Sequence, residues 1–210
     1  MIINGIKFLL ISAIVSLLFL IPSFNIDGFG VVNDVPQDVE YVIKFQYPDT
    51  WKHLPEYNVD TTDDDDDDLS TTSFTLIHNS SINNDIGKSS NGYLITIKVI
   101  DEISLLITAE QWARTALVEF STQPDKYKLI EPHTPNGEFK TLPISQEKYN
   151  GYTYTIEDKT TQKIKVNTVL VLDNKRYEFE YTSPNINNEV AYRYIDDHKE
   201  ILNSVKFTDS

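Results

Sequence analysis

Histidine side chains are the first candidates for chemistry in this chain, because an imidazole can transfer protons and bind metal ions. Of the 4 histidines, none lies at a metal-binding spacing from another. His198 stands apart, because a helical period places it on an apolar stripe with Tyr194 and Leu202. It is either a ligand or proton-handling group in a groove shared with Tyr194, or a histidine at the core edge with a hydrogen-bond partner.

Carboxylates offer a second chemistry, the binding of a hard cation such as calcium. An uninterrupted acidic run consists of Asp63, Asp64, Asp65, Asp66, Asp67 and Asp68. It lacks the interleaved glycine and the closing glutamate of an EF-hand, and a mobile loop loses entropy when it wraps an ion. We expect a solvated loop with weak calcium binding at best, and no other cofactor. Calorimetric titration with calcium, before and after deletion of residues 63–68, measures this binding.

Covalent and acid/base catalysis have no recognisable pattern in the sequence. The chain has no cysteine and no G-x-S-x-G motif, and its 7 glycines form no phosphate-binding loop. Adjacent acids such as Glu157 and Asp158 would point to opposite faces of a strand. We therefore expect a protein that is not an enzyme. A hydrolase would require a fold that brings a serine, a histidine and a carboxylate together.

Charge and composition limit the class of partner. The net charge is −14, from 32 acidic and 18 basic residues. Such a surface repels the phosphates of nucleic acids and the headgroups of anionic lipids, so nucleic-acid binding is disfavoured. Basic protein surfaces and cations are the favoured partners. Hydrophobic residues make up 40% of the 210 residues, which suits one folded domain with an additional segment.

The N-terminal segment indicates export. Residues 8–21 are uncharged and apolar and follow Lys7, as in a secretory signal. Counted from Ile2, the segment approaches the length of a membrane-spanning helix. Residues 1–24 are therefore predicted to be a signal peptide or a membrane anchor, and residues 25–38 a linker. The protein is expected outside the cytoplasm, secreted or tethered, with the membrane contacted only through this segment.

The elements that would position these residues are mainly strands. Residues 41–47 alternate between two sets, Tyr41, Ile43, Phe45 and Tyr47 against Val42, Lys44 and Gln46, which predicts a strand with one aromatic face that is ended by Pro48. Trp51 is expected to fold back over the strand end as a core plug. A polar, acidic loop insertion is predicted at residues 55–73. Further strands are predicted at Phe74–His78, Tyr93–Ile100, Tyr127–Glu131 and Tyr152–Glu157.

Two helices and a hairpin complete the prediction. Thr108 and Gln111 form a capping box that opens a helix with an apolar face of Trp112, Ala116, Leu117 and Phe120. A hairpin is predicted from Ile164–Leu172 and Arg176–Thr182, with its turn at Asp173-Asn174. A last helix over Glu189–Asn203, capped by Asn187 or Asn188, precedes a strand ending at Phe207. Because strands predominate in hairpins, the fold class is α+β with a mainly antiparallel sheet.

The order and spacing of these pieces resemble the PsbP family, which comprises the extrinsic subunit of the photosynthetic oxygen-evolving complex and its relatives outside photosynthesis. The matching pieces are Tyr47–Trp51, the strands at Phe74 and Tyr93, the Trp112 helix, Gly151–Tyr154, Asp173–Tyr177 and Ile201–Phe207. The resemblance covers residues 39–208 and implies an antiparallel sheet sandwiched by helices. It implies an accessory, non-catalytic domain that docks on a larger, often membrane-associated assembly, and it carries over no site residue.

The sequence therefore predicts an exported accessory domain with a protein partner. The alternative is a cell-surface protein that binds a small ligand or calcium, through the acidic loop or a groove beside the C-terminal helix.

Overall fold

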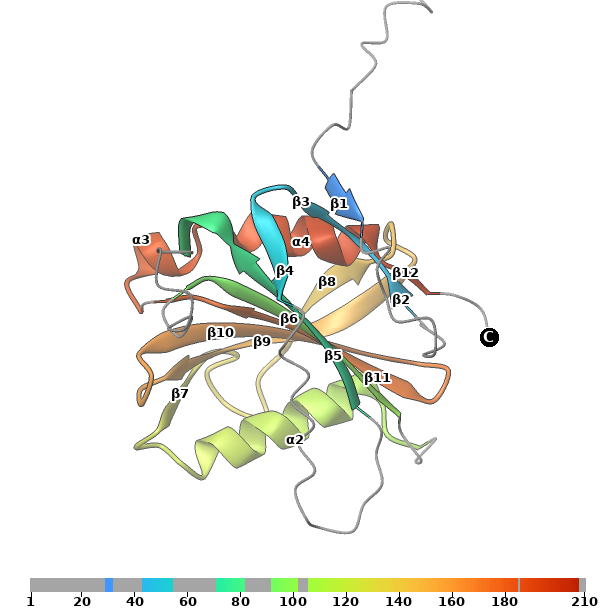
Figure 1. The fold of residues 1–210 in the computed structure, drawn as a ribbon. Helices are drawn as coiled ribbons and strands as arrows, with labels where there is room; N and C mark the ends of the chain where they lie inside the picture. The colour runs from blue at the N-terminus through green and yellow to red at the C-terminus, as the bar shows by residue number, and fades with distance from the viewer. Residues whose placement is uncertain are drawn as a thin grey trace, which may run out of the picture.

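The computed structural model describes residues 29–31, 43–54, 71–81, 92–101, 106–184 and 186–207. Within this part of the chain, the predicted α+β class is confirmed: an eight-stranded antiparallel sheet carries helices on both faces (Figure 1). The N-terminal segment of residues 1–24 and the acidic run of residues 63–68 lie outside the described residues, so both remain predictions. Among the described helices, none has the length and apolar character needed to cross a membrane.

The large sheet has the strand order β4-β5-β6-β11-β10-β9-β7, with β8 paired to the other half of β9. Two small two-stranded sheets, β1-β3 and β12-β2, lie beside it. The strands are β1 (Phe29–Val31), β2 (Ile43–Lys44), β3 (Gln46–Pro48), β4 (Trp51–Leu54), β5 (Thr71–His78), β6 (Leu94–Asp101), β7 (Tyr127–Glu131), β8 (Lys140–Ile144), β9 (Tyr149–Asp158), β10 (Lys163–Leu172), β11 (Lys175–Thr182) and β12 (Lys206–Phe207). The helices are α2 (Ala109–Ser121), α3 (Asn188–Ala191) and α4 (Ile195–Ser204), with a 3-10 turn η1 at Asn79–Ser81.

Alternation along β11 decides which side chains face each helix layer. Tyr177, Phe179 and Tyr181 are fully buried beneath α4, in the larger hydrophobic core. The intervening Arg176 and Glu178 face the layer of α2 and form an ion pair at 3.1 Å between Arg176 Nε and Glu178 Oε1. The sequence predicts this alternation with a solvated face for the charged residues, whereas the structure places the Arg176 guanidinium 4.0 Å from the centre of the Trp112 ring of α2. The predicted turn also holds, because Asp173 and Asn174 both have positive φ.

Helix α2 covers the other face with a smaller core. The predicted capping box is confirmed, since Thr108 Oγ1 accepts from the Gln111 N–H and the Gln111 side chain accepts from the Thr108 N–H. Leu117 is fully buried. The helix packs on Tyr154 and Ile156 of β9 and on Val169 of β10.

Two predictions at element boundaries are corrected. The predicted loop at residues 55–73 is too long, because Thr71, Thr72 and Ser73 already pair with β6 as part of β5. The predicted single helix over Glu189–Asn203 is wrong: α3 ends at Ala191, and α4 begins at Ile195. Tyr192 and Tyr194 leave helical geometry between them, at φ −106° and φ −118°. The interruption allows Tyr194 to stack against His78 of β5, which a continuous helical pattern does not reveal.

Of the two predicted capping residues, Asn187 is the N-cap of α3, because its side chain accepts a hydrogen bond from the Glu189 N–H.

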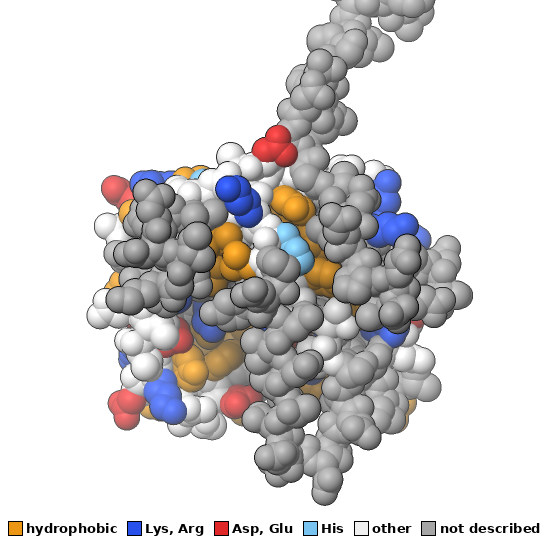
Figure 2. All heavy atoms as spheres, viewed as in Figure 1, with side chains coloured by type: hydrophobic (Ala, Val, Ile, Leu, Met, Phe, Trp, Pro, Cys, Tyr) orange, Lys and Arg blue, Asp and Glu red, His pale blue; other side chains and the backbone are white. Residues whose placement is uncertain are grey.

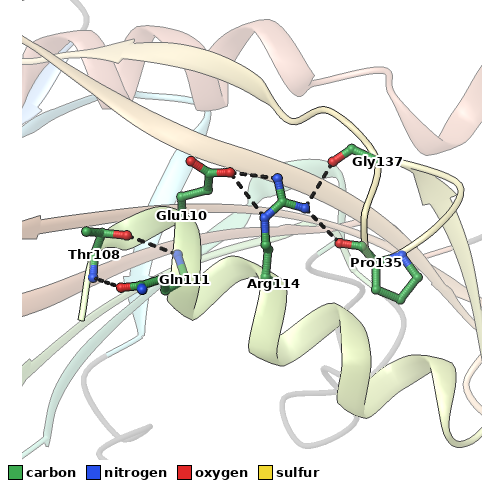
Figure 3. A network of polar contacts seen from close by, with 6 residues as sticks. All are labelled: Thr108, Glu110, Gln111, Arg114, Pro135 and Gly137. Atoms are coloured by element: carbon green, nitrogen blue, oxygen red, sulfur yellow. Dashed lines mark hydrogen bonds and ion pairs between the residues drawn. The ribbon is translucent and has the colours of Figure 1, made fainter. Parts of the chain in front are cut away.

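The loop between β7 and β8 is fixed to α2 by one arginine (Figure 3). Arg114 donates twice to Glu110 Oε1, at 2.6 and 3.1 Å, and also donates to the carbonyls of Pro135 and Gly137, at 2.9 and 3.2 Å. Its guanidinium lies 4.9 Å from the centre of the Phe139 ring. One side chain thus supplies donors to a helix and a loop at once.

We expect Arg114→Met to lower the free energy of unfolding by about 1–2 kcal/mol, because two loop carbonyls lose a charged donor. Urea denaturation followed by circular dichroism measures this loss. The control is Lys128→Met, which removes an exposed ion pair to Glu157 at 3.5 Å. That change is expected to cost less than about 0.5 kcal/mol. Equal losses in both variants would contradict the bridging role of Arg114.

Candidate functional site

Tyr194 lies where the break between α3 and α4 meets the end of β5. Its ring stacks on the imidazole of His78, with centres 3.8 Å apart and planes at 22°. The rings of Tyr93 and Trp51 meet Tyr194 edge-on, at 4.7 and 6.3 Å. The side chains come from β4, β5, the residue just before β6 and the helix break, so they join the C-terminal helices to the sheet.

Trp51 is the predicted core plug, and the structure confirms this role. Only 2% of Trp51 is exposed. Its indole Nε1 donates a 2.7 Å hydrogen bond to Asp197 Oδ2 in the first turn of α4. In the antiparallel register of β4 and β5, Trp51 is paired with His78. Because the pairing partner lies 27 residues on, no local sequence signal places His78 in this site.

The protonation state of His78 follows from its hydrogen bonds. Its Nδ1 accepts the backbone N–H of Ser80 at 3.1 Å, and the Ser80 hydroxyl lies 2.7 Å from the same atom. A backbone N–H can only donate, so Nδ1 carries no proton and the ring is neutral. Burial lowers the pKa of His78, and the nearby Asp197 carboxylate partly offsets this effect. His78 therefore fixes the turn η1 as a neutral acceptor.

His198 does not line a groove, because its side chain is 0% exposed. It lies in the core beneath α4, with its ring 6.1 Å from that of Tyr181. Neither ring nitrogen has a hydrogen-bond partner among the described residues, so the expected core-edge partner is missing as well. Burial, aided by the charge of Lys199, lowers the pKa of His198 to about 3. The imidazole is thus neutral at physiological pH.

The two histidines border one aromatic cluster, which we call the tyrosine cluster: Tyr93, Tyr181 and Tyr194. Tyr93 lies between the other two, with ring centres 6.3 Å from Tyr181 and 4.7 Å from Tyr194. The hydroxyls of Tyr93 and Tyr181 donate to the carbonyls of Val190 and Ala191. Burial raises the pKa of both phenols. The cluster therefore binds α3 to the sheet through neutral groups.

Ser80, His78 and Asp197 are the residue types that a hydrolase would require. Within the described residues, however, the Asp197 carboxylate accepts from Trp51 and not from the imidazole. The Ser80 hydroxyl and its own N–H both approach one nitrogen of His78, in a turn that closes on itself. This geometry favours a structural role. Over the same residues, no group of three metal-binding side chains comes together.

Helices lie on both sides of the described sheet: α2 packs on β7, β9 and β10, and α3 and α4 lie on the other side (Figure 1). Figure 2 shows hydrophobic side chains reaching one surface in separate patches among charged ones. The large exposed hydrophobic residues in this part of the chain are Leu106, Val118 and Ile186. Two of the three belong to α2 or to the residues just before it.

No family model matches this chain, and neither does any curated protein. Solved structures that are similar include a protein from Bacteroides thetaiotaomicron, with 9% identity over 80% of this chain and a TM-score of 0.41. The chain spans 46% of that protein. LpqN, involved in cell envelope biogenesis of Mycobacterium tuberculosis, has 10% identity over 80% of this chain and 83% of its own, with a TM-score of 0.48.

A third similar structure is cyanobacterial PsbP (CyanoP) from Synechocystis, with 10% identity over 89% of this chain and 96% of its own, and a TM-score of 0.47. These similarities concern the fold alone. One of the similar structures, the cyanobacterial PsbP, belongs to the family that the sequence of this chain resembles.

Proposed function

We propose that this chain is an exported, non-catalytic accessory domain of the PsbP-like type that docks on a protein partner in a larger, membrane-associated assembly. The family resemblance across residues 39–208 supports the accessory role. The apolar segment of residues 8–21 supports export and provides the contact with the membrane.

The outer face of α2 is the observation that carries the docking role. Val118 is 50% exposed on this helix, and Leu106, just before it, is 86% exposed. Gln111 and Thr115 are also exposed and precede Val118 at helical spacing, and the exposed Glu119 lies beside them, four residues after Thr115. In a chain of net charge −14, this face of α2 presents three uncharged side chains, with Glu119 at its edge. Depletion of charge and exposed apolar area are marks of the centre of a protein interface.

The test is affinity isolation of the full chain from membranes, with a double variant, Leu106→Asp and Val118→Asp. We expect the wild type to recover a stable partner, and the double variant to recover at least about tenfold less, because two carboxylates would be desolvated in the interface. The matched control is Thr141→Asp, an exposed position on a different element, β8. Circular dichroism confirms that all three proteins are folded.

Two outcomes would count against this proposal. Repeated recovery of the wild type alone would contradict the docking role. Equal recovery of the partner by the wild type and the double variant would show that α2 is not the interface.

A further inference from the structure

We propose that residues 188–204, comprising α3 and α4, form an acid-released latch. Below neutral pH, proton uptake by His78 and His198 favours a state in which the N-terminal end of this segment has left the sheet. This inference rests on the two buried histidines and is independent of the proposed docking partner.

In the folded protein, the surroundings of His198 disfavour the protonated imidazole. The ring is fully buried beneath α4 and has no hydrogen-bond partner among the described residues for either nitrogen. An imidazolium there would be a buried, unpaired charge, which is among the costliest arrangements in a protein core. Lys199 adds a second positive charge next to it in the sequence. Once the helix leaves the sheet, the ring can be hydrated and protonated.

His78 opposes protonation for a different reason. Its Nδ1 accepts the Ser80 N–H, so in a protonated ring the Nδ1–H and the Ser80 N–H would be two donors that face each other. The same ring carries the stack with Tyr194, which holds the break between α3 and α4 on the sheet. Protonation would therefore weaken the turn η1 and the attachment of the helices together. His78 holds the segment from the side of the sheet, whereas His198 belongs to the segment itself, so a variant of each histidine tests its contribution separately.

The other groups that face these histidines set the limits of the effect. Asp197 faces His78 and favours its protonated form, which reduces the contribution of His78. Burial raises the pKa of Tyr93 and Tyr181, so these phenols stay uncharged between pH 5 and 7.5. The driving force for release therefore comes mainly from His198, with a smaller share from His78.

The C-terminal end of α4 is held by groups that do not titrate. The N–H groups of Ser145 and Gln146 donate to the carbonyls of Leu202 and Asn203. Ser204 Oγ accepts the Gln46 N–H and donates to the Gln46 carbonyl. These contacts persist in acid. Release should therefore begin at α3 and Tyr194, with the end of α4 as the hinge.

Hydrogen exchange of the full chain, followed by mass spectrometry at pH 7.5 and pH 5 and corrected for intrinsic rates, tests the latch. A histidine that changes from an ordinary pKa in the open state to an unprotonated closed state raises the opening constant about thirtyfold over this range. We expect peptides from α3 and from the start of α4 to lose protection by about this factor or more. Peptides from β10 should lose less.

Two variants make the result decisive. His198→Leu removes the main titrating group and should reduce the acid loss of protection in α3 by about thirtyfold. His78→Asn keeps an acceptor for Ser80 that cannot be protonated in this range. This variant should remove the smaller part of the acid-induced loss of protection, the part that comes from His78. An equal loss of protection in all peptides would show a global transition and overturn the latch. An undiminished acid loss in a folded double variant would overturn the role of the histidines.

Discussion

Replacing Trp51 with alanine is expected to lower the free energy of unfolding by about 3–5 kcal/mol, the largest effect of any single change at the site. The indole is almost fully buried, and its ring lies edge-on to His78 and Tyr194. Alanine would leave a cavity between β4 and α4 that the surrounding strands cannot close. It would also remove the hydrogen bond to Asp197, which joins β4 to the first turn of the last helix. Urea denaturation measures the change.

A phenylalanine at the same position separates the two contributions. Trp51→Phe keeps most of the ring packing and loses the N–H donor, so its expected cost is about 1–3 kcal/mol, the range for a hydrogen bond to a charged group. Equal costs for alanine and phenylalanine would mean that the hydrogen bond matters and the packing does not. A cost below about 1 kcal/mol for alanine would show that Trp51 is not the core plug described above.

The second large effect concerns acid. The pKa of His198 is about 3 in the folded protein, against a reference value of 6.5. Between these values the unfolded chain binds a proton that the folded chain does not, so the protein loses stability as the pH falls. The contribution is fully present above about pH 6.5 and declines by about 1.4 kcal/mol per pH unit below it. From pH 7.5 to pH 4.5, His198 alone should cost about 2.7 kcal/mol.

His198→Leu should remove this part of the acid dependence. At neutral pH the variant should also be more stable by about 1–3 kcal/mol, because two buried nitrogens without partners are replaced by an apolar side chain of similar size. The measurement is a series of denaturant titrations of both proteins from pH 7.5 to pH 4.5. Carboxylates and other histidines titrate in both, so the difference between the two curves isolates His198. Parallel curves would contradict the assignment.

The hairpin shows how much of the fold could be predicted. The alternation of Tyr177, Phe179 and Tyr181 with charged residues predicts which side chains face the core, and Asp173-Asn174 predicts the turn. The capping box at Thr108 is equally local. All of these signals lie within one element, where the period of the side chains and the preferences of a turn act without help from the rest of the chain.

The site could be predicted only in part. The helical pattern marks Tyr194 and His198 as candidates, but it does not predict which residues surround them. The pattern continues through Tyr192 and Tyr194 and so hides the break between the helices. Sequence also predicts no strand at residues 140–144, where β8 pairs with the first half of β9. Pairing along a sheet edge depends on the partner strand, and the partner is set by the topology.

Sequence alone predicts the fold class and the alternation of side chains along the strands, and it carries the resemblance to the PsbP family. It also determined the net charge that limits the class of partner. Only the tertiary structure decided that His78 stacks on Tyr194, that Trp51 bonds to Asp197 and that His198 is buried without a partner. The reason is physical. Periodicity is a property of short segments, whereas the burial and hydrogen bonding of one side chain depend on residues more than a hundred positions away.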